Sequence, residues 1–362
     1  MQPINVLVTA VGGGGLGEQI TKALRLASTP YWIIGTDISP YSKGFMDVDR
    51  AEIVPTARDP EFTGALLRLC ETHQIRALLC GSEAELKVLD RDRDEFGRRG
   101  VFVPINPPSV LEVCLDKVKT ARFLSAHGFS SPDFRRISSL EDLAGFSHLP
   151  AVLKPSTGGG GSANVFLAQT SQEMEMFAKY LFTIYPEFIV QEYVGRPEAE
   201  FTVGVLTAMD GALLNSIAVR RSITTALSTR INQPNRTART DLGPRLVISN
   251  GFSQGEIGAF LEVTHPCEQI AAAIGSRGPL NVQCRLVNGK VSVFEINPRF
   301  SGTTSLRAMV GYNEPDVLIR RHVLNEHIEP HFEYRSRFIL RGLSESLLDS
   351  DMIERLSAAQ RS

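Results

Sequence analysis

Two apolar runs flank an Asn-Gly pair in residues 279–298. Asn288–Gly289 is the strongest turn signal in the sequence, because both residue types tolerate the positive φ values of a two-residue hairpin turn. The flanking runs, LNVQCRLV and KVSVFEIN, have the composition of strands. The stretch therefore predicts an antiparallel β-hairpin.

This hairpin would gather three side chains that carry oxygen ligands. If the chain turns tightly at Asn288–Gly289, the numbers of any two facing residues add up to about 577. The numbers of Gln283 and Glu295 add up to 578, so these two residues lie within one position of direct pairing. Glu295 and Asn297 are separated by one residue, so both point to the same face of a strand. A carboxylate and two amide carbonyls suit Mg²⁺. The pattern predicts a metal site, with a polar surface patch as the alternative.

The first part of the chain has a different pattern. Strand-like runs at 4–11, 31–37, 75–82 and 101–106 alternate with amphipathic helical patterns. Such alternation is typical of a parallel sheet covered on both faces. We expect this first α/β unit to end near Pro107–Pro108.

A glycine-rich loop follows the first strand. Gly12, Gly14 and Gly17 fit the spacing G-x-G-x-x-G, and Asp37 ends the second strand twenty residues later. This is the fingerprint of a dinucleotide-binding domain. It leaves an NAD(P)-dependent oxidoreductase as an alternative function, although a single G-x-G-x-x-G is a weak signal.

A second glycine-rich loop lies in the stretch LKPSTGGGGSA. Lys154 ends an apolar strand, and the glycines at 158–161 stand between this strand and the next. Backbone N–H groups of such a loop can converge on a phosphate, and Lys154 would add a positive charge. The order of residues is not that of a P-loop, and a flexible hairpin tip is the alternative.

The remaining segments after residue 108 predict an α+β arrangement. Two short helices are expected over 109–127, a hairpin turns at Asp210–Gly211, and a long helix covers 253–275. Residues 224–242 are polar and poorly patterned, which predicts a mobile loop. The tail after about 330 is charged and Ser-rich, so we expect it to be loosely held.

The composition argues against several classes of protein. The 362 residues are 43% hydrophobic with a net charge of −2, and they contain neither a basic block nor an apolar run of membrane-spanning length. The five cysteines are scattered without C-x-x-C spacing, which suggests reduced thiols in the cytoplasm. We therefore expect a cytoplasmic protein that binds neither nucleic acid nor membrane.

The stretch GPLNVQCRLVNGKVSVFEINPRFSGTTS resembles the ATP-grasp superfamily, and within it the ATP-binding halves of the carbamoyl-phosphate synthase large subunit. The resemblance covers roughly residues 4–325. It implies a Rossmann-like pre-ATP-grasp domain over 1–108 that binds no nicotinamide. A two-lobed ATP-grasp domain would follow over 109–330, with the smaller lobe at about 115–190, the larger lobe at about 191–330 and a tail at 331–362. The implied fold class is α/β plus α+β.

The resemblance also implies the residues that bind Mg²⁺ and the ATP phosphates. Gln283, Glu295 and Asn297 match the positions that hold Mg²⁺ in the family. Lys117, in the step Asp116–Lys117, and Lys154 would contact phosphates. The glycines that would close over the phosphates are Gly158, Gly159 and Gly160.

At the other end of the nucleotide, the resemblance implies an adenine edge and a ribose contact. The stretch VQEYV would present main-chain groups of Gln191, Glu192 and Val194 to adenine. An acidic residue would bind the ribose hydroxyls. Glu198 and Glu200 are both candidates, and we favour Glu198.

The implied activity is that of a carboxylate–amine ligase. ATP phosphorylates a carboxylate, and an amine then displaces phosphate from the acyl phosphate to form a C–N bond. ATP and Mg²⁺ would be the cofactors, with two ions expected and Mn²⁺ as a substitute. The substrates would be a small carboxylate and a small amine, and the protein would form a homodimer.

Several residues are predicted to act on these substrates. Arg299 shares a strand face with Asn297 and is predicted to be catalytic together with Lys154. The candidates for substrate binding are Arg220, Arg221, Gly302 and Ser305.

The chain departs from carbamoyl-phosphate synthase, since it contains one ATP-grasp unit and no recognisable glutaminase part. An amino-acid or dipeptide ligase is therefore preferred. A carboxyphosphate-forming enzyme and a nucleotide-binding regulatory subunit without turnover are further alternatives.

Overall fold

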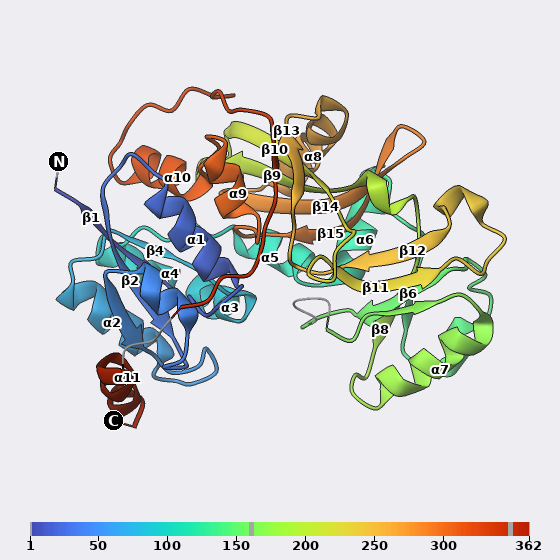
Figure 1. Cartoon of the computed structure of the whole chain (residues 1–362), viewed down its shortest axis with the longest axis horizontal. Coiled ribbons are helices and arrows are strands. Elements are labelled where there is room, and N and C mark those ends of the chain that lie inside the picture. Colours follow the sequence, from blue (N-terminus) through green and yellow to red (C-terminus); the bar gives the residue numbers. More distant parts are fainter. Residues whose placement is uncertain (1, 159–162, 347–349, 362) are drawn as a thin grey trace.

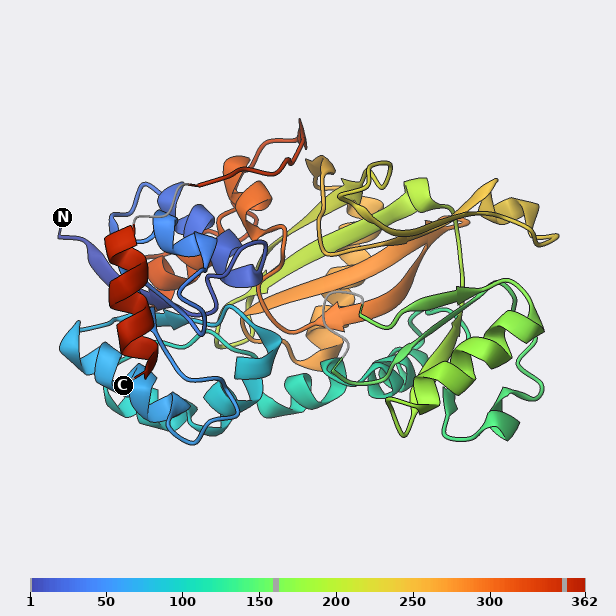
Figure 2. The ribbon, with the colours of Figure 1, turned by 60° about the horizontal axis from the view of Figure 1, so that its bottom comes forward.

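The computed structural model describes residues 2–158, 163–346 and 350–361. The molecule is elongated, and three parts follow one another along its long axis (Figure 1). The N-terminal part lies at one end, a large antiparallel sheet occupies the middle and a smaller sheet lies at the other end. The two views show the same arrangement (Figure 2).

The N-terminal part is built on a four-stranded parallel sheet of order β3-β2-β1-β4. Its strands are β1 (Ile4–Val8), β2 (Tyr31–Asp37), β3 (Arg50–Ile53) and β4 (Ala77–Leu79). The helices are α1 (Leu16–Arg25), α2 (Phe62–Thr72), α3 (Glu83–Arg91) and α4 (Arg93–Arg98). The expected strand at 101–106 is wrong, because only one isolated bridge, between Ala77 and Phe102, forms there. Strand β3 was not expected, because its four residues, RAEI, lack an apolar pattern.

Two helices connect the N-terminal part to the rest, as the sequence predicted. They are α5 (Pro108–Cys114) and α6 (Lys117–Ala126). Asp116 caps α6, since its carboxylate accepts hydrogen bonds from the N–H groups of Val118 and Lys119. This cap fixes where α6 begins and therefore fixes the position of Lys117, the first residue of the helix.

The smaller sheet has four antiparallel strands in the order β5-β8-β6-β7. They are β5 (Phe134–Ile137), β6 (Ala151–Pro155), β7 (Phe166–Ala168) and β8 (Phe188–Glu192). Helix α7 (Ser171–Phe182) covers one face of this sheet (Figure 1). The buried faces of the sheet and the helix form a compact apolar cluster that includes Leu153, Met174 and Val190.

The larger sheet has six antiparallel strands in the order β15-β14-β9-β10-β13-β16. The strands are β9 (Glu200–Thr207), β10 (Leu213–Arg221), β13 (Gly255–Gly258), β14 (Pro279–Val287), β15 (Lys290–Asn297) and β16 (Arg337–Ile339). Helix α8 (Leu261–Ile274) packs on one face. Helices α9 (Thr304–Met309) and α10 (Glu314–His322) lie on the other face, together with α1 from the N-terminal part. One apolar core therefore joins the N-terminal part to the larger sheet.

Two expectations for the middle of the chain are wrong. Residues 224–242 contain β11 (Thr229–Pro234), which pairs with β12 (Arg245–Ser249) in a two-stranded sheet. The burial of β11 alternates residue by residue between half-buried and exposed, and its mostly polar sequence hides this period. Residues 255–258 form strand β13, so the helix begins only at Leu261.

The tail is also better anchored than expected. Strand β16 pairs with β13 at the edge of the larger sheet, and helix α11 (Ser350–Arg361) packs beside β3. Leu356 of α11 is 2% exposed and belongs to the core shared by the N-terminal part and the larger sheet. Short 3-10 helices complete the description: Lys43–Asp47, Leu140–Leu143, Pro197–Ala199 and Thr240–Leu242.

Candidate active site

The hairpin of β14 and β15 places Gln283 directly opposite Glu295. Asn288 and Gly289 turn the chain with φ values of 50° and 76°, as the predicted turn requires. From the turn up to Cys284 and Val293 the facing residues keep the tight-turn register, and a bulge then shifts it by one residue. Phe294 is the extra residue of this bulge. The one-position mismatch expected from the sequence is thereby removed.

The bulge also decides which way Glu295 points. Val291, Val293 and Ile296 all belong to the apolar core under α8. In a regular strand Glu295 would share the face of Val293. Because Phe294 is inserted, Glu295 and Asn297 point away from that core, toward the face that carries Gln283.

A pocket between the two sheets brings most of the predicted nucleotide-binding residues together. Its empty space, including open solvent at its mouth, is about 610 Å³. The smaller sheet contributes residues of β6 and β8, and the larger sheet contributes residues of β9, β14 and β15. The predicted residues among its lining are Lys154, Gln191, Glu192, Val194, Glu200, Gln283 and Glu295.

Lys154 is a buried cation that lines this pocket, as does Arg285. Its Nζ donates to the main-chain oxygen of Phe294 at 3.2 Å. The bulge therefore provides the hydrogen-bond partner of Lys154. Burial lowers the pKa of Lys154 to about 8; the charge of Lys117 acts in the same direction and that of Glu295 opposes it.

The two acids proposed for ribose differ in position. Glu198 is exposed and does not line the pocket. Glu200 is 2% exposed and lines it. Its carboxylate already accepts four hydrogen bonds, two from Arg285 and one each from Arg221 and Ser249. Although burial alone would raise the pKa of Glu200, the two arginines hold it below its usual range. The geometry therefore favours neither acid as a free ribose acceptor.

Asn297 and Arg299 lie at the end of β15, where the N-terminal part approaches. The guanidinium of Arg299 donates to Glu83 of α3 at 2.8 Å and to Asn297 Oδ1 at 3.0 Å. Burial alone would raise the pKa of Glu83, but Arg299 and Lys117 lower it. Asn297 is 4% exposed, and its Nδ2 has no hydrogen-bond partner among the described residues. An oxygen of a bound phosphate would satisfy this buried donor.

The four predicted substrate contacts are in different surroundings. Arg220 is exposed and pairs with Glu256, so it does not face the pocket. Arg221 is buried against Glu200 and Asn250. Ser305 donates to Gln19 of α1, and the main-chain oxygen of Gly302 accepts a hydrogen bond from Arg341. Ser305 therefore lies at the contact with the N-terminal part, and Gly302 lies at the contact with the C-terminal segment.

Two N–H groups of the N-terminal glycine loop donate to side chains of the protein. Asp37 accepts from the N–H of Gly12 at 2.7 Å, and Glu18 accepts from the N–H of Gly14. A Cβ atom on Gly17 would lie 2.2 Å from the main-chain oxygen of Thr9. Gly17 therefore allows α1 to pack closely on β1, and Asp37 holds the loop. Asp37, the acid that would bind ribose in a dinucleotide site, is therefore already engaged by the N–H of Gly12.

The second glycine loop is only partly described. Gly158 has a φ of 70°, a left-handed conformation that favours glycine. The predicted phosphate contacts at Gly159 and Gly160 lie outside the described residues.

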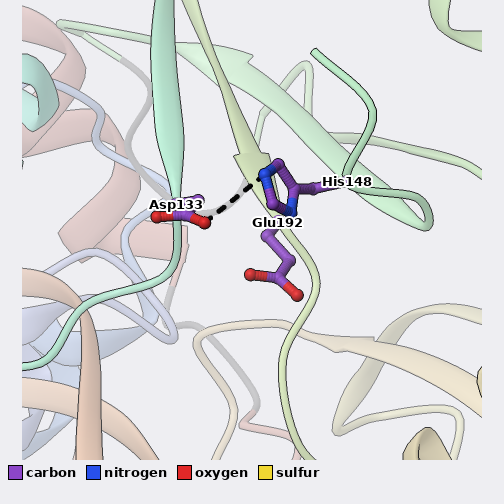
Figure 3. A group of neighbouring side chains, drawn as sticks. All are labelled: Asp133, His148 and Glu192. Atoms are coloured by element: carbon purple, nitrogen blue, oxygen red, sulfur yellow. Dashed lines mark ion pairs between the residues drawn. The ribbon is translucent and has the colours of Figure 1, made fainter.

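A separate polar cluster stands at the edge of the smaller sheet. One side-chain ligand atom from each of Asp133, His148 and Glu192 lies within 4.8 Å of the others, and His148 pairs with Asp133 at 3.4 Å (Figure 3). Asp133 and His148 are exposed, and Arg239 donates to Glu192 at 3.1 Å. We interpret this cluster as a surface ion-pair group.

Comparisons with known proteins agree with this architecture. A family model described as the PylC-like N-terminal domain matches residues 6–104. A second, described as ATP-grasp in the biosynthetic pathway with Ter operon, matches residues 250–341, which include β14 and β15. The second description names ATP-grasp, the superfamily that the sequence resembles. The resemblance seen in the sequence and the expected fold class are therefore confirmed.

Several solved structures resemble most of the chain. L-amino acid ligase from Bacillus licheniformis is 17% identical with a TM-score of 0.64, over 91% of this chain and 78% of that chain. N5-carboxyaminoimidazole ribonucleotide synthetase from Thermotoga maritima is 19% identical with a TM-score of 0.58, over 93% and 79%. Biotin carboxylase from Campylobacter jejuni is 14% identical with a TM-score of 0.61, over 88% and 70%. At these identities the likeness shows the fold.

Two further findings complete the comparison. A search of curated proteins finds no significant match to this sequence. Within the described part of the chain, no helix has the length and apolar character needed to cross a membrane.

Sequence reasoning missed three residues of this region. Glu83 pairs with Arg299, Arg285 binds Glu200, and Arg341 reaches Gly302 and Ser305. Arg285 carried a usable signal, because it follows Gln283 by two residues on the same strand face. Glu83 and Arg341 carried none, since each reaches the site from a distant part of the chain.

Proposed function

We propose that this chain is an ATP-dependent ligase that activates a carboxylate as an acyl phosphate and joins it to an amine. The observation that carries the proposal is the direct pairing of Gln283 with Glu295 on the wall of a pocket that Lys154 also lines. Carboxylate and amide oxygens beside a lysine are the groups that a Mg²⁺-bound triphosphate requires.

The residues present fit a divalent ion. Gln283 and Glu295 each offer an oxygen to the pocket, and Asn297 stands on the same strand face, where its Oδ1 accepts a hydrogen bond from Arg299. These three residues would hold Mg²⁺ bound to ATP, and the ion would supply charge neutralisation at the phosphates. We expect two ions, and we expect Mn²⁺ to substitute.

The other residues of the chain would position the reacting groups. Main-chain groups at 191–194 would hold adenine at the edge of β8. Lys154 and Lys117 would neutralise phosphate charge, and Arg299 would hold the transferred phosphoryl group. Since Glu83 already binds Arg299, the N-terminal part would fix the orientation of this guanidinium.

The reaction would proceed in two displacements. A carboxylate oxygen attacks the γ-phosphorus, and the bond to the bridging oxygen breaks to release ADP. The amine nitrogen then attacks the acyl carbon, loses a proton and expels phosphate, so that a C–N bond forms. The pocket between the two sheets would limit access of water to the acyl phosphate.

We prefer small carboxylates and amines, such as amino acids, as substrates. A cytoplasmic homodimer remains our expectation for the assembly and its location. The five cysteines are free and buried, as expected for reduced thiols.

The test is a screen for ADP release over pairs of amino acids and small carboxylates, with mass spectrometry of the products. We expect at least one pair to give ADP, phosphate and a product heavier than either substrate. Mg²⁺–ATP should raise the melting temperature of the protein, and NAD⁺ or NADPH should not. A shift with the nicotinamide cofactors alone would contradict the proposal.

A further inference from the structure

The chain passes from the smaller sheet to the larger sheet between β8 and β9, through a segment that we call the hinge (residues 193–199). Tyr193 and Val194 of the hinge line the pocket between the sheets. The next residue, Gly195, has a φ of 65°, and a Cβ atom on it would lie 2.9 Å from Cγ2 of Val287. The hinge therefore packs closely against β14.

Arg285 of β14 binds the hinge with a guanidinium whose five N–H groups all donate to protein oxygens. Its Nη1 donates to the main-chain oxygens of Val194 at 3.1 Å and Gly195 at 3.2 Å. Its Nε and Nη2 donate to Glu200 at 3.1 Å and 2.9 Å, and Nη2 also donates to the main-chain oxygen of Val247 at 2.8 Å. Arg285 lines the pocket, but no N–H group is left for a ligand.

The guanidinium of Arg285 is itself held in place by its surroundings. Its carbon Cζ lies 4.5 Å from the centre of the Tyr193 ring. The hydroxyl of Tyr193 donates to the main-chain oxygen of Val247 at 3.2 Å and accepts from the N–H of the same residue at 2.9 Å. Arg285, Tyr193 and Val247 are all buried. The arginine, the hinge and β12 therefore form one hydrogen-bonded unit beside the pocket.

This unit determines which polar groups of the hinge remain for a nucleobase. The carbonyls of Val194 and Gly195 are turned toward Arg285. The N–H of Val194 has no hydrogen-bond acceptor within the described part of the chain. Adenine accepts a hydrogen bond at its ring nitrogen N1, whereas guanine and hypoxanthine carry a proton there and donate. A base of the second kind would place its N1–H against the N–H of Val194, and two unpaired donors in a closed pocket are costly.

We propose that Arg285 is a positioning residue that makes the pocket select adenine over guanine and hypoxanthine. It withdraws two hinge carbonyls from the pocket and leaves the N–H of Val194 to meet N1 of the base. This inference rests on the proposed function and names the residue that sets the base specificity of the same site. Without Arg285 the carbonyls of Val194 and Gly195 lose their donor, so either can turn to the pocket and accept from a protonated N1.

The test is calorimetric titration of the full chain with ADP, inosine diphosphate and pyrophosphate, each with Mg²⁺. Inosine diphosphate carries hypoxanthine, which has the protonated N1 of guanine without its 2-amino group. The wild type should bind ADP at least about tenfold more tightly than inosine diphosphate. In Arg285→Met this ratio should fall toward one. Arg285→Lys should give an intermediate ratio, because an ammonium keeps the charge but not the planar set of donors.

The ratio of the two nucleotide affinities separates positioning from a general loss of structure or charge, since both nucleotides carry the same phosphates. Pyrophosphate, which has no base, should bind Arg285→Lys as it binds the wild type. The matched control is Arg245→Gln, an exposed arginine of β12 that donates to Asn232, and it should keep the wild-type ratio. A wild type that binds both nucleotides equally, or a folded Arg285→Lys or Arg285→Met variant with the full ratio, would overturn the inference. Failure of the wild type to bind ADP would instead overturn the proposed function.

Discussion

Gln283 and Glu295 face each other across a hairpin whose turn alone would leave them one position apart. The bulge at Phe294 corrects this offset, turns Glu295 out of the apolar core and releases the main-chain oxygen that Lys154 binds. One inserted residue thus forms three features of the candidate site. The bulge thus shapes the candidate site, and bulges are over-represented beside active sites.

Lys154 should make nucleotide affinity depend on pH. Its pKa in the ligand-free protein lies at about 8, so the lysine loses its charge above that pH. The Kd for AMPPNP in the presence of Mg²⁺ should be constant below this pH and then rise toward tenfold per pH unit. Calorimetric titration from pH 6.5 to 9.5 measures this slope. Lys154→Met should bind weakly with no inflection near pH 8, and an identical slope in both proteins would refute the assignment.

Lys154 should affect stability in the opposite direction: nucleotide affinity falls as the pH rises, whereas the stability of the fold rises. Its folded pKa of about 8 lies below the ordinary value of 10.5, so between these pH values the unfolded chain binds a proton that the folded chain does not. The contribution of Lys154 to the free energy of unfolding should therefore rise with pH across this window. Urea denaturation of wild type and Lys154→Met at pH 7.5 and 9.5 isolates the contribution.

Gly17 should serve packing and not cofactor binding. A Cβ atom at this position would lie 2.2 Å and 2.4 Å from the main-chain oxygens of Thr9 and Ala10. Gly17→Ala should lower the free energy of unfolding by about 1–3 kcal/mol, as overpacked cores do. The control is Gly97→Ala in α4, where nothing lies within 4 Å. It should be neutral or stabilising by about 0.5–1 kcal/mol. Wild-type stability of Gly17→Ala in urea denaturation would contradict this role.

Helix α11 should contribute to global stability. Leu356 is 2% exposed in the core between the N-terminal part and the larger sheet. Leu356→Ala should therefore cost about 2–5 kcal/mol. Leu343→Ala, at a residue that is 73% exposed, should change stability by less than about 0.5 kcal/mol. Equal effects of the two substitutions in urea denaturation would show that the tail is not part of the core.

Local patterns in the sequence predicted much of this fold. The Asn288–Gly289 turn, the Asp210–Gly211 turn and the alternation of β1, α1 and β2 depend on neighbouring residues, and the structure confirms them. The bulge could not be predicted, because Phe294 is compatible with either face of a strand. The register to which it leads was therefore predicted only to within one residue.

The errors share a physical cause. Strand β11 is polar because its sheet has two strands and little core, so no apolar period marks it. Strand β16 has three residues and is held by pairing to β13, a contact between segments about eighty residues apart. Arg341 follows that strand, so its place near Gly302 depends on the same distant contact. Tertiary contacts of this kind have no local signature in the chain.

The central claim is that Glu295 and its strand neighbours hold a divalent ion that carries ATP. Calorimetric titration with AMPPNP, in Mg²⁺ and in EDTA, tests it in wild type, in Glu295→Gln and in Glu256→Gln, a control at an exposed acid paired with Arg220. Mg²⁺ should tighten binding at least about tenfold, or about 1.4 kcal/mol, in wild type and the control. Glu295→Gln should lose this gain while keeping its melting temperature. An undiminished Mg²⁺ effect in Glu295→Gln would contradict the account.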